Sequence, residues 1–162
     1  MPVTTTAARE TKITADPELP LVRIVREFDA PPERVFRAHT DPALFAQWCG
    51  PRGYAMEIER YDCRTGGAYR YVHTGPDGAF GFHGSFHEVR PNELIVQTFT
   101  FEGFPDGVAL ERLVLEPLEG GRTRLTATSL VDSFEARDAF LASGMEVGVR
   151  EGYERLDDLL AG

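Results

Sequence analysis

Short links between strand-like segments constrain the fold of this chain more than any other feature. Between residues 54 and 131, apolar and polar side chains alternate in six runs, at 54–62, 68–73, 81–90, 93–101, 108–117 and 122–131. The links include GPDG at 75–78, RPNE at 90–93 and EGG at 119–121, which favour tight turns. Because a parallel crossover needs about a dozen residues or more, the six runs predict an antiparallel sheet.

One further strand and two short helices are predicted before these six runs. The strand covers residues 21–28, LVRIVREF, where side chains alternate between two faces. The segment DAPPERVFRAHTD at 29–41 predicts a short helix with Asp29 as its N-cap. Asp41 and Pro42 then open a second short helix.

The end of the chain predicts one long helix of about 25 residues, from DSFE at 132–135 to Leu160. Asp132 and Glu135 have the spacing of a capping box. Gly148 and Gly152 lie along the edge of the apolar face of this helix, and each costs about 1 kcal/mol relative to alanine. Two explanations stay open: close approach of the helix backbone to the sheet, or room beside the helix for a guest molecule.

Charge and composition exclude several classes of protein. The net charge is −9, with 26 acidic and 17 basic residues, which argues against a nucleic-acid partner. No apolar stretch approaches the roughly eighteen residues of a membrane span. The first twenty residues lack the apolar run of a signal peptide, and Cys49 and Cys63 form no disulfide or metal pattern. We therefore expect a cytoplasmic protein with two free thiols, organised as a flexible tail at 1–17 and a single domain at 18–162.

Six segments, taken together, point to a known family. They are REFDAPPERVFRAHTDPALFAQWCGP at 26–51, DCRTGG at 62–67, GPDG at 75–78, GSFHEVRPNELIVQTF at 84–99, GGRTRLTAT at 120–128 and SGMEVGVREGYERLDDLL at 143–160. Residues 21–161 resemble the START-like (SRPBCC, Bet v 1-like) superfamily, in the branch similar to the C-terminal domain of the activator of the heat-shock protein 90 ATPase. The resemblance implies an α+β helix-grip fold. In that fold a curved antiparallel sheet of about seven strands surrounds a long C-terminal helix, with two short helices between the first two strands.

The resemblance also implies an apolar cavity between the sheet and the long helix, which would bind a small hydrophobic or amphipathic ligand without a cofactor. The residues expected to line it are Trp48, Met56, Tyr69, Tyr71, Phe82, Phe86, Phe99, Met145, Gly148, Val149 and Gly152. Trp48 is expected either at the mouth of the cavity or in the core. His83 and His87 share a strand face and are candidate polar contacts to a ligand if Val89 points inward with them. Two histidines without a third ligand do not predict a metal site.

Two other classes of function remain alternatives. One is a protein-interaction module that contacts a chaperone in a stress response, as the resemblance implies. The other is a cyclase-like or hydrolase-like enzyme that would use the cavity, although no catalytic motif is present and no catalytic residue is assigned. Asp62 and Arg64 of the DCRTGG segment are expected to stabilise a turn. The sequence leaves open whether the protein is a monomer or a homodimer.

Overall fold

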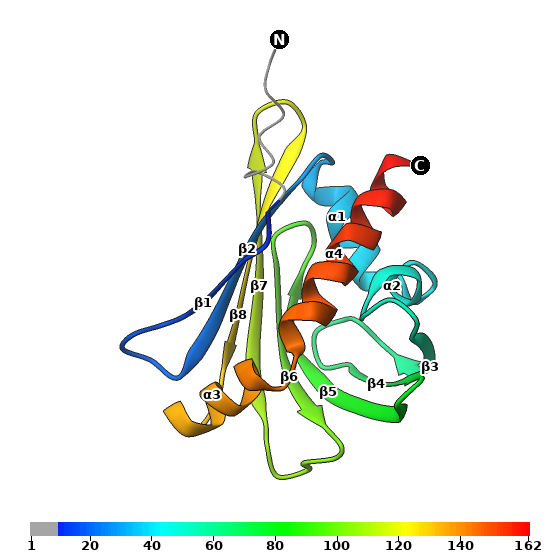
Figure 1. Ribbon diagram of the computed structural model, residues 1–162. Coiled ribbons are helices and arrows are strands. Elements are labelled where there is room, and N and C mark those ends of the chain that lie inside the picture. The colour runs from blue at the N-terminus through cyan, green and yellow to red at the C-terminus, as the bar shows by residue number, and fades with distance from the viewer. Residues whose placement is uncertain (1–9) are drawn as a thin grey trace.

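A single antiparallel sheet of eight strands forms the body of the protein. The computed structural model describes residues 10–162. Across the sheet the order is β1-β2-β8-β7-β6-β5-β4-β3, and every neighbouring pair is antiparallel (Figure 1). The strands are β1 (Lys12–Ala15), β2 (Leu21–Phe28), β3 (Ala55–Tyr61), β4 (Ala68–Gly75), β5 (Gly78–Arg90), β6 (Leu94–Phe101), β7 (Ala109–Leu118) and β8 (Arg122–Leu130).

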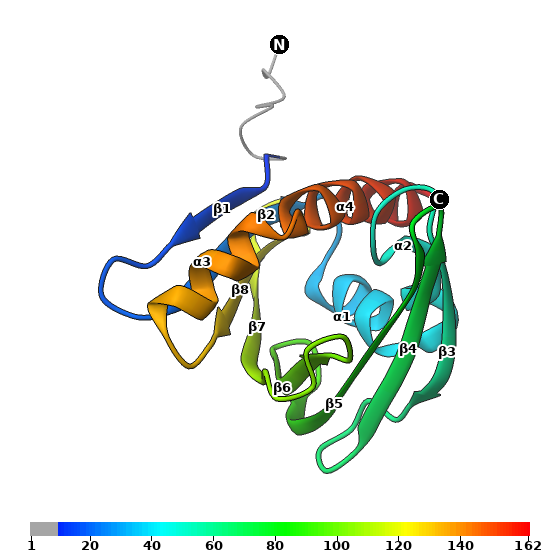
Figure 2. The ribbon, with the colours of Figure 1, turned by 60° about the horizontal axis from the view of Figure 1, so that its bottom comes forward.

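Four helices complete the fold. Two of them, α1 (Pro32–Thr40) and α2 (Pro42–Trp48), connect β2 to β3, and the other two, α3 (Phe134–Ala142) and α4 (Met145–Ala161), follow β8. The sheet curves, α4 crosses its open side, and α1 and α2 lie at one end (Figure 2). This arrangement confirms the predicted α+β helix-grip fold with two short helices ahead of β3.

Strand β1 corrects the prediction of a flexible tail over residues 1–17 and of about seven strands. Ile13 of β1 pairs with Ile24 of β2. An edge strand is recruited through backbone hydrogen bonds, so a segment of only four residues can pair without a clear side-chain pattern. The part of the predicted tail at residues 1–9 lies outside the described residues.

The prediction of one unbroken C-terminal helix is wrong. Gly144 has φ +87° and separates α3 from α4. A left-handed residue cannot continue a right-handed helix, and glycine adopts that conformation at low cost. Helix α3 therefore ends, and α4 starts again in a new direction with 17 residues (Figure 2).

Two of the predicted helix caps also differ from the structure. Helix α3 is capped by Ser133, one residue after the predicted Asp132, and the Ser133 Oγ accepts a hydrogen bond from the Ala136 amide at 3.0 Å. Pro31 occupies the N-cap position of α1, whereas Asp29 accepts a hydrogen bond from Arg122 Nε at 2.8 Å. Helix α2 opens at Asp41 and Pro42 as predicted, and the Asp41 carboxylate accepts a hydrogen bond from the Ala43 amide.

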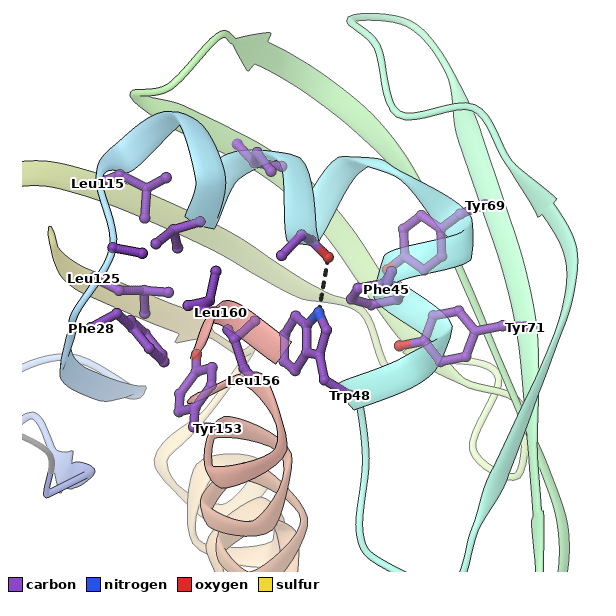
Figure 3. Packing of buried hydrophobic residues seen from close by; sticks show 14 of the residues in the cluster. Phe28, Phe45, Trp48, Tyr69, Tyr71, Leu115, Leu125, Tyr153, Leu156 and Leu160 are labelled. Carbon is purple, nitrogen blue, oxygen red and sulfur yellow. Dashed lines mark hydrogen bonds between the residues drawn. The ribbon is translucent and has the colours of Figure 1, made fainter. Parts of the chain in front are cut away.

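The C-terminal half of α4 is fixed in the core. Its buried residues are Gly152, Tyr153, Leu156 and Leu160. Tyr153, Leu156 and Leu160 point toward the cluster that includes Phe28 and Trp48 (Figure 3). The Tyr153 ring lies edge-on to Phe28 at 5.4 Å and stacks with Trp48 at 5.9 Å. Apolar burial therefore holds this half of the helix against β2, α1 and α2.

An ion pair adds a polar link between α4 and the sheet. Arg26 of β2 is only 2% exposed, and its Nη1 donates to Asp157 Oδ1 at 3.0 Å while Nη2 donates to Oδ2. The guanidinium also lies 4.8 Å from the centre of the Phe28 ring. Because an unpaired buried cation is costly, Asp157 makes this position of Arg26 possible.

We expect Asp157→Ala to lower the free energy of unfolding by roughly 3 kcal/mol, because it leaves the Arg26 charge buried without its partner. Urea denaturation followed by circular dichroism measures the change. Asp158→Ala removes the exposed neighbouring carboxylate and should change stability by less than about 0.5 kcal/mol. Equal effects of the two variants would show that the Arg26–Asp157 pair does not stabilise the fold.

Candidate functional site

The concave face of the sheet carries the aromatic side chains expected from the sequence. Ring centroids are 5.8 Å apart for Tyr69 and Tyr71, 5.6 Å for Tyr71 and Phe82, 5.3 Å for Phe82 and Phe99, and 5.1 Å for Tyr69 and Phe86. Three of the five, Tyr69, Tyr71 and Phe86, are buried, and the other two pack against the core. These rings form a continuous aromatic surface over β4, β5 and β6.

Trp48 and Met56 also contact this interior. Trp48 is 5% exposed and donates from Nε1 to the carbonyl oxygen of Ala38 at 2.8 Å (Figure 3). Of the two positions expected for Trp48, the structure therefore shows the core position. Met56 of β3 is partly buried and packs against the same cluster.

Polar side chains cross the concave face beside the aromatic surface. Gln97 of β6, Glu111 of β7 and Ser129 of β8 are direct partners in the strand register. Gln97 Nε2 donates to Glu111 Oε1 at 3.2 Å, and Ser129 Oγ donates to Glu111 Oε2 at 3.0 Å. Gln97 Nε2 also lies 3.3 Å from the Tyr69 hydroxyl. We call Tyr69, Gln97, Glu111 and Ser129 the polar row.

Gly84 makes room for the first member of the polar row. The Tyr69 hydroxyl donates to the carbonyl oxygen of Thr98 at 2.6 Å. A Cβ at Gly84 would lie 2.6 Å from that hydroxyl and 2.0 Å from the same carbonyl oxygen. Any larger residue at this position would therefore displace Tyr69.

Glu111 is the acidic group of the polar row. Burial raises the pKa of its carboxyl to about 7, and the hydrogen bonds from Ser129 and Gln97 offset this rise only in part. Its charge in turn contributes to raising the pKa of Cys49, Tyr69, Tyr71 and Tyr153, although burial is the larger cause for each. These side chains come from the end of α2, from β4 and from α4, so they surround one common region.

Inward-facing side chains in this region keep part of their surface accessible. Gln97, Glu111, Leu113 and Ala127 are each partly exposed, although they lie on the concave face of the central strands. On the same strands near α1, Leu115 and Leu125 are 4% and 0% exposed. Met145 and Val149, in the N-terminal half of α4, are also partly exposed.

The two glycines of α4 face the link between α2 and β3. A Cβ at Gly152 would lie 3.3 Å from the Trp48 carbonyl oxygen and 3.4 Å from the Gly50 amide nitrogen. At Gly148 the nearest atom would be Pro51 Cδ, at an ordinary distance of 3.5 Å. The geometry favours the close-packing explanation for Gly152, with the α2–β3 link in place of the expected sheet as the neighbour.

The structure places the two candidate histidines away from the interior, which corrects their role as ligand contacts. His83 Nδ1 lies 2.8 Å from Glu102 Oε2, and Glu102 also pairs with Arg70 on the outer face. A register shift between Phe86 and Glu88 breaks the alternation of β5. Val89 therefore packs against the core while His83 and His87 stay exposed. Within residues 10–162, no group of three His, Cys, Asp or Glu side chains is arranged to hold a metal ion.

The DCRTGG segment forms a tight turn, as expected. Arg64 Nε donates to both carboxylate oxygens of Asp62 at 2.9 Å. Gly66 has φ +85°, and a Cβ at Gly67 would lie 1.9 Å from the Asp62 carbonyl oxygen. Both glycines are therefore required by the backbone path between β3 and β4.

Two hollows flank the C-terminal end of α4, away from the polar row. One of about 70 Å³ is lined by Asp29, Asp157, Leu160 and Ala161. The other, of about 260 Å³, is lined by Arg34, Arg37, Ala38, Leu44, Leu159 and Leu160. Neither contains a residue of the cavity expected from the sequence.

Comparison with known proteins defines the family. A family model described as Activator of Hsp90 ATPase homolog 1-like protein matches residues 29–161. The chain belongs to this family. Among curated proteins, none matches. No helix within residues 10–162 has both the length and the apolar composition needed to cross a membrane.

Solved structures similar to this member of the Activator of Hsp90 ATPase homolog 1-like family come from several bacteria. A Rhodobacter sphaeroides protein is 33% identical, with 93% of this chain and 97% of that chain covered and a TM-score of 0.83. An Arthrobacter aurescens protein is 32% identical, with coverage of 93% and 91% and a TM-score of 0.84. A Mycobacterium smegmatis protein is 26% identical, with coverage of 93% and 97% and a TM-score of 0.84.

The sequence analysis of this family member did not identify three of the four residues of the polar row: Gln97, Glu111 and Ser129. Alternation in residues 108–117 places Glu111 on the same face as Leu113 and Leu115. An acidic residue on the apolar face of a strand is a signal for a buried polar site. Gln97 and Ser129 gave no such signal, because they become partners of Glu111 only through the register of three strands.

We expect Gly148→Ala to raise the free energy of unfolding by roughly 0.5–1 kcal/mol, because alanine favours a helix and its Cβ fits beside Pro51. Gly152→Ala should gain clearly less or lose stability, because its Cβ presses on two backbone atoms. Thermal and urea denaturation of both variants make the comparison. An equal gain at both positions would contradict close packing at Gly152.

We expect Glu111→Gln to become increasingly more stable than the wild type as the pH rises. The folded-state pKa of Glu111, about 7, lies above its ordinary value of 4.5, so folding favours the protonated carboxyl. That contribution is complete below pH 4.5 and is lost as the pH rises through 7. Between pH 4 and pH 8 the difference should grow by on the order of 3 kcal/mol in urea denaturation.

Glu116→Gln is the matched control, since Glu116 is exposed on the same strand. Its difference from the wild type should vary much less over this pH range. A pH-independent difference for Glu111→Gln would show that the Glu111 carboxyl is not desolvated.

Proposed function

We propose that this protein binds a small hydrophobic or amphipathic molecule between the N-terminal half of α4 and the concave face of the sheet. The observation that carries the proposal is the partial exposure of inward-facing residues around Glu111 in the middle of the sheet. Protein interiors are normally packed about as densely as organic crystals. Side chains at the centre of a filled core would be buried.

The attachment of α4 explains how such a space would be maintained. All buried residues of the helix belong to its C-terminal half, from Gly152 to Leu160. The Arg26–Asp157 pair lies in the same half. Met145 and Val149 are only partly buried, and Val149 packs against the edge of the core cluster. Polar contacts hold this half of α4 at its sides, from Arg150 to the Thr11 carbonyl oxygen and from the Arg52 amide to Glu151.

The side chains around this region suit a small-molecule site. Ligand sites are mostly apolar and aromatic, with a few polar groups that orient the ligand. Tyr69, Tyr71 and Phe99 supply the aromatic surface, and Gln97 and Glu111 supply polar atoms. An amphipathic ligand satisfies both kinds of surface.

The other expectations about function remain predictions. The name of the family suggests contact with a chaperone, but a shared fold does not by itself transfer a partner or a role in the stress response. An enzymatic use of the site would need an ionisable group that reaches the ligand, and Glu111 would be the candidate for that role. Absence of a cofactor, a cytoplasmic location and a monomeric or homodimeric state also stay predictions from the sequence.

Binding of the neutral probe 4-phenylbutan-1-ol tests the proposal. Isothermal titration calorimetry should detect one site per chain in the wild type. Val149→Trp should remain folded and weaken binding about tenfold or more, because the larger ring occupies the space beside the polar row. Val147→Trp, an identical exchange at a residue that is 56% exposed, should leave binding unchanged.

Two results would contradict this proposal. Loss of about 1–3 kcal/mol of stability in Val149→Trp but not in Val147→Trp would indicate that the region is already filled. Unchanged binding in Val149→Trp would place the ligand elsewhere on the protein.

A further inference from the structure

We propose that the ligand of this site is a lipophilic amine whose protonated nitrogen binds the carboxylate of Glu111. The inference rests on the proposed function and specifies its ligand class. It comes from three features of residues 10–162: Glu111 can accept further hydrogen bonds, it pairs with no positive charge among these residues, and aromatic side chains lie near it.

Glu111 can accept more hydrogen bonds than residues 10–162 supply. Each carboxylate oxygen accepts one, from Gln97 Nε2 at 3.2 Å and from Ser129 Oγ at 3.0 Å. An ionised carboxylate has about four acceptor positions. An ammonium group has three donors and no acceptor, so it complements the remaining positions.

Glu111 also differs from other partly buried acids in its electrostatic partners. Asp157 pairs with Arg26, and Glu102 pairs with Arg70. Within residues 10–162 Glu111 forms no ion pair, and its two hydrogen-bond donors are neutral. Because a buried charge is costly without an opposite charge, a cationic ligand would relieve this cost.

The side chains around Glu111 favour a cation over an anion. The charge of Glu111 acts on Tyr69, Tyr71 and Tyr153, so three aromatic side chains lie in the same region. Aromatic rings interact favourably with a nearby cation. The pKa of each tyrosine hydroxyl is raised by burial, and burial raises the pKa of the Cys49 thiol to about 12. All four groups therefore stay neutral near pH 7. Among these five groups, Glu111 is the one that carries charge near pH 7, where its carboxyl is about half ionised.

Two arginines lie near this region, but neither forms an ion pair with Glu111. Arg26 lowers the pKa of Tyr153 slightly, but its guanidinium is paired with Asp157. Arg155 acts on Cys49, and its guanidinium donates to the carbonyl oxygen of Gln47 at 2.6 Å. Both arginines are committed to partners on α4 or α2.

Binding of an amine to Glu111 should release the proton of its carboxyl group. The pKa of Glu111 is about 7, so at pH 6 the carboxyl is mostly protonated before an amine binds. An ammonium ion stabilises the ionised carboxylate, so binding at pH 6 should release roughly 0.9 proton per site. A neutral ligand with the same tail should release almost none.

Three probes with the same tail test the inference: 4-phenylbutylamine, 4-phenylbutan-1-ol and 4-phenylbutanoate. Calorimetry at pH 7.5 should show the amine binding about tenfold or more tighter than the alcohol, and the carboxylate binding weakest. Titrations at pH 6 in two buffers of different ionisation enthalpy should give the proton release. Glu111→Gln should weaken the amine about tenfold or more, change the alcohol less than about threefold and abolish proton release.

Glu116→Gln is the control for net charge, because it removes an exposed carboxylate from the same strand. It should leave all three affinities within about threefold, as screening by salt predicts for an exposed charge. Equal affinities for the three probes, with no effect of Glu111→Gln, would overturn the amine preference and leave ligand binding intact. Failure of the alcohol to bind the wild type would overturn the proposed function and this inference together.

Discussion

The attachment of α4 through its C-terminal half is the constraint on which the rest of the structure depends. Tyr153, Leu156 and Leu160 are buried against the core, and Asp157 neutralises the otherwise isolated charge of Arg26. These contacts set where the helix crosses the open side of the sheet. They leave its N-terminal half, with Met145 and Val149, less buried. The break at Gly144 then allows α3 to turn away from the axis of α4 and to pack against β2.

The buried carboxyl of Glu111 on the concave face lowers the stability of the folded protein when it is ionised. Glu111 is held by neutral donors in a region that disfavours its charge, and the fold tolerates this with no compensating cation in residues 10–162. Apolar residues of similar volume would be expected to stabilise the fold more. A group that opposes folding in this way is more typical of a functional site than of a structural one, because strained or perturbed groups cluster where ligands act. A cationic ligand that relieves the cost of the Glu111 charge would therefore also stabilise the folded protein.

Much of the fold could be predicted because its signals are local. GPDG at 75–78 joins β4 to β5 with Gly75 paired to Gly78, as its turn chemistry indicated. The edge strand β1 could not be predicted in this way, because its pairing depends on the exposed backbone of β2. Gly144 was visible in the sequence, but a glycine inside a helical pattern can be tolerated at a cost, so its presence alone did not predict the end of a helix. Alternation placed Tyr69, Tyr71 and Phe82 on strands but did not identify the face that became concave.

The resemblance of six segments indicated the family. By itself, the sequence determined the order of the strands from β2 to β8 and of helices α1 and α2, the antiparallel connections and the aromatic character of the interior. Each of these follows from side-chain period, turn chemistry or composition over a few neighbouring residues. Only the tertiary structure decided that Gln97, Glu111 and Ser129 meet, that Gly152 contacts the α2–β3 link, and that His83 faces outward. The reason is physical: strand register and a single β-bulge fix which side chains become neighbours, and both depend on contacts between residues far apart in the chain.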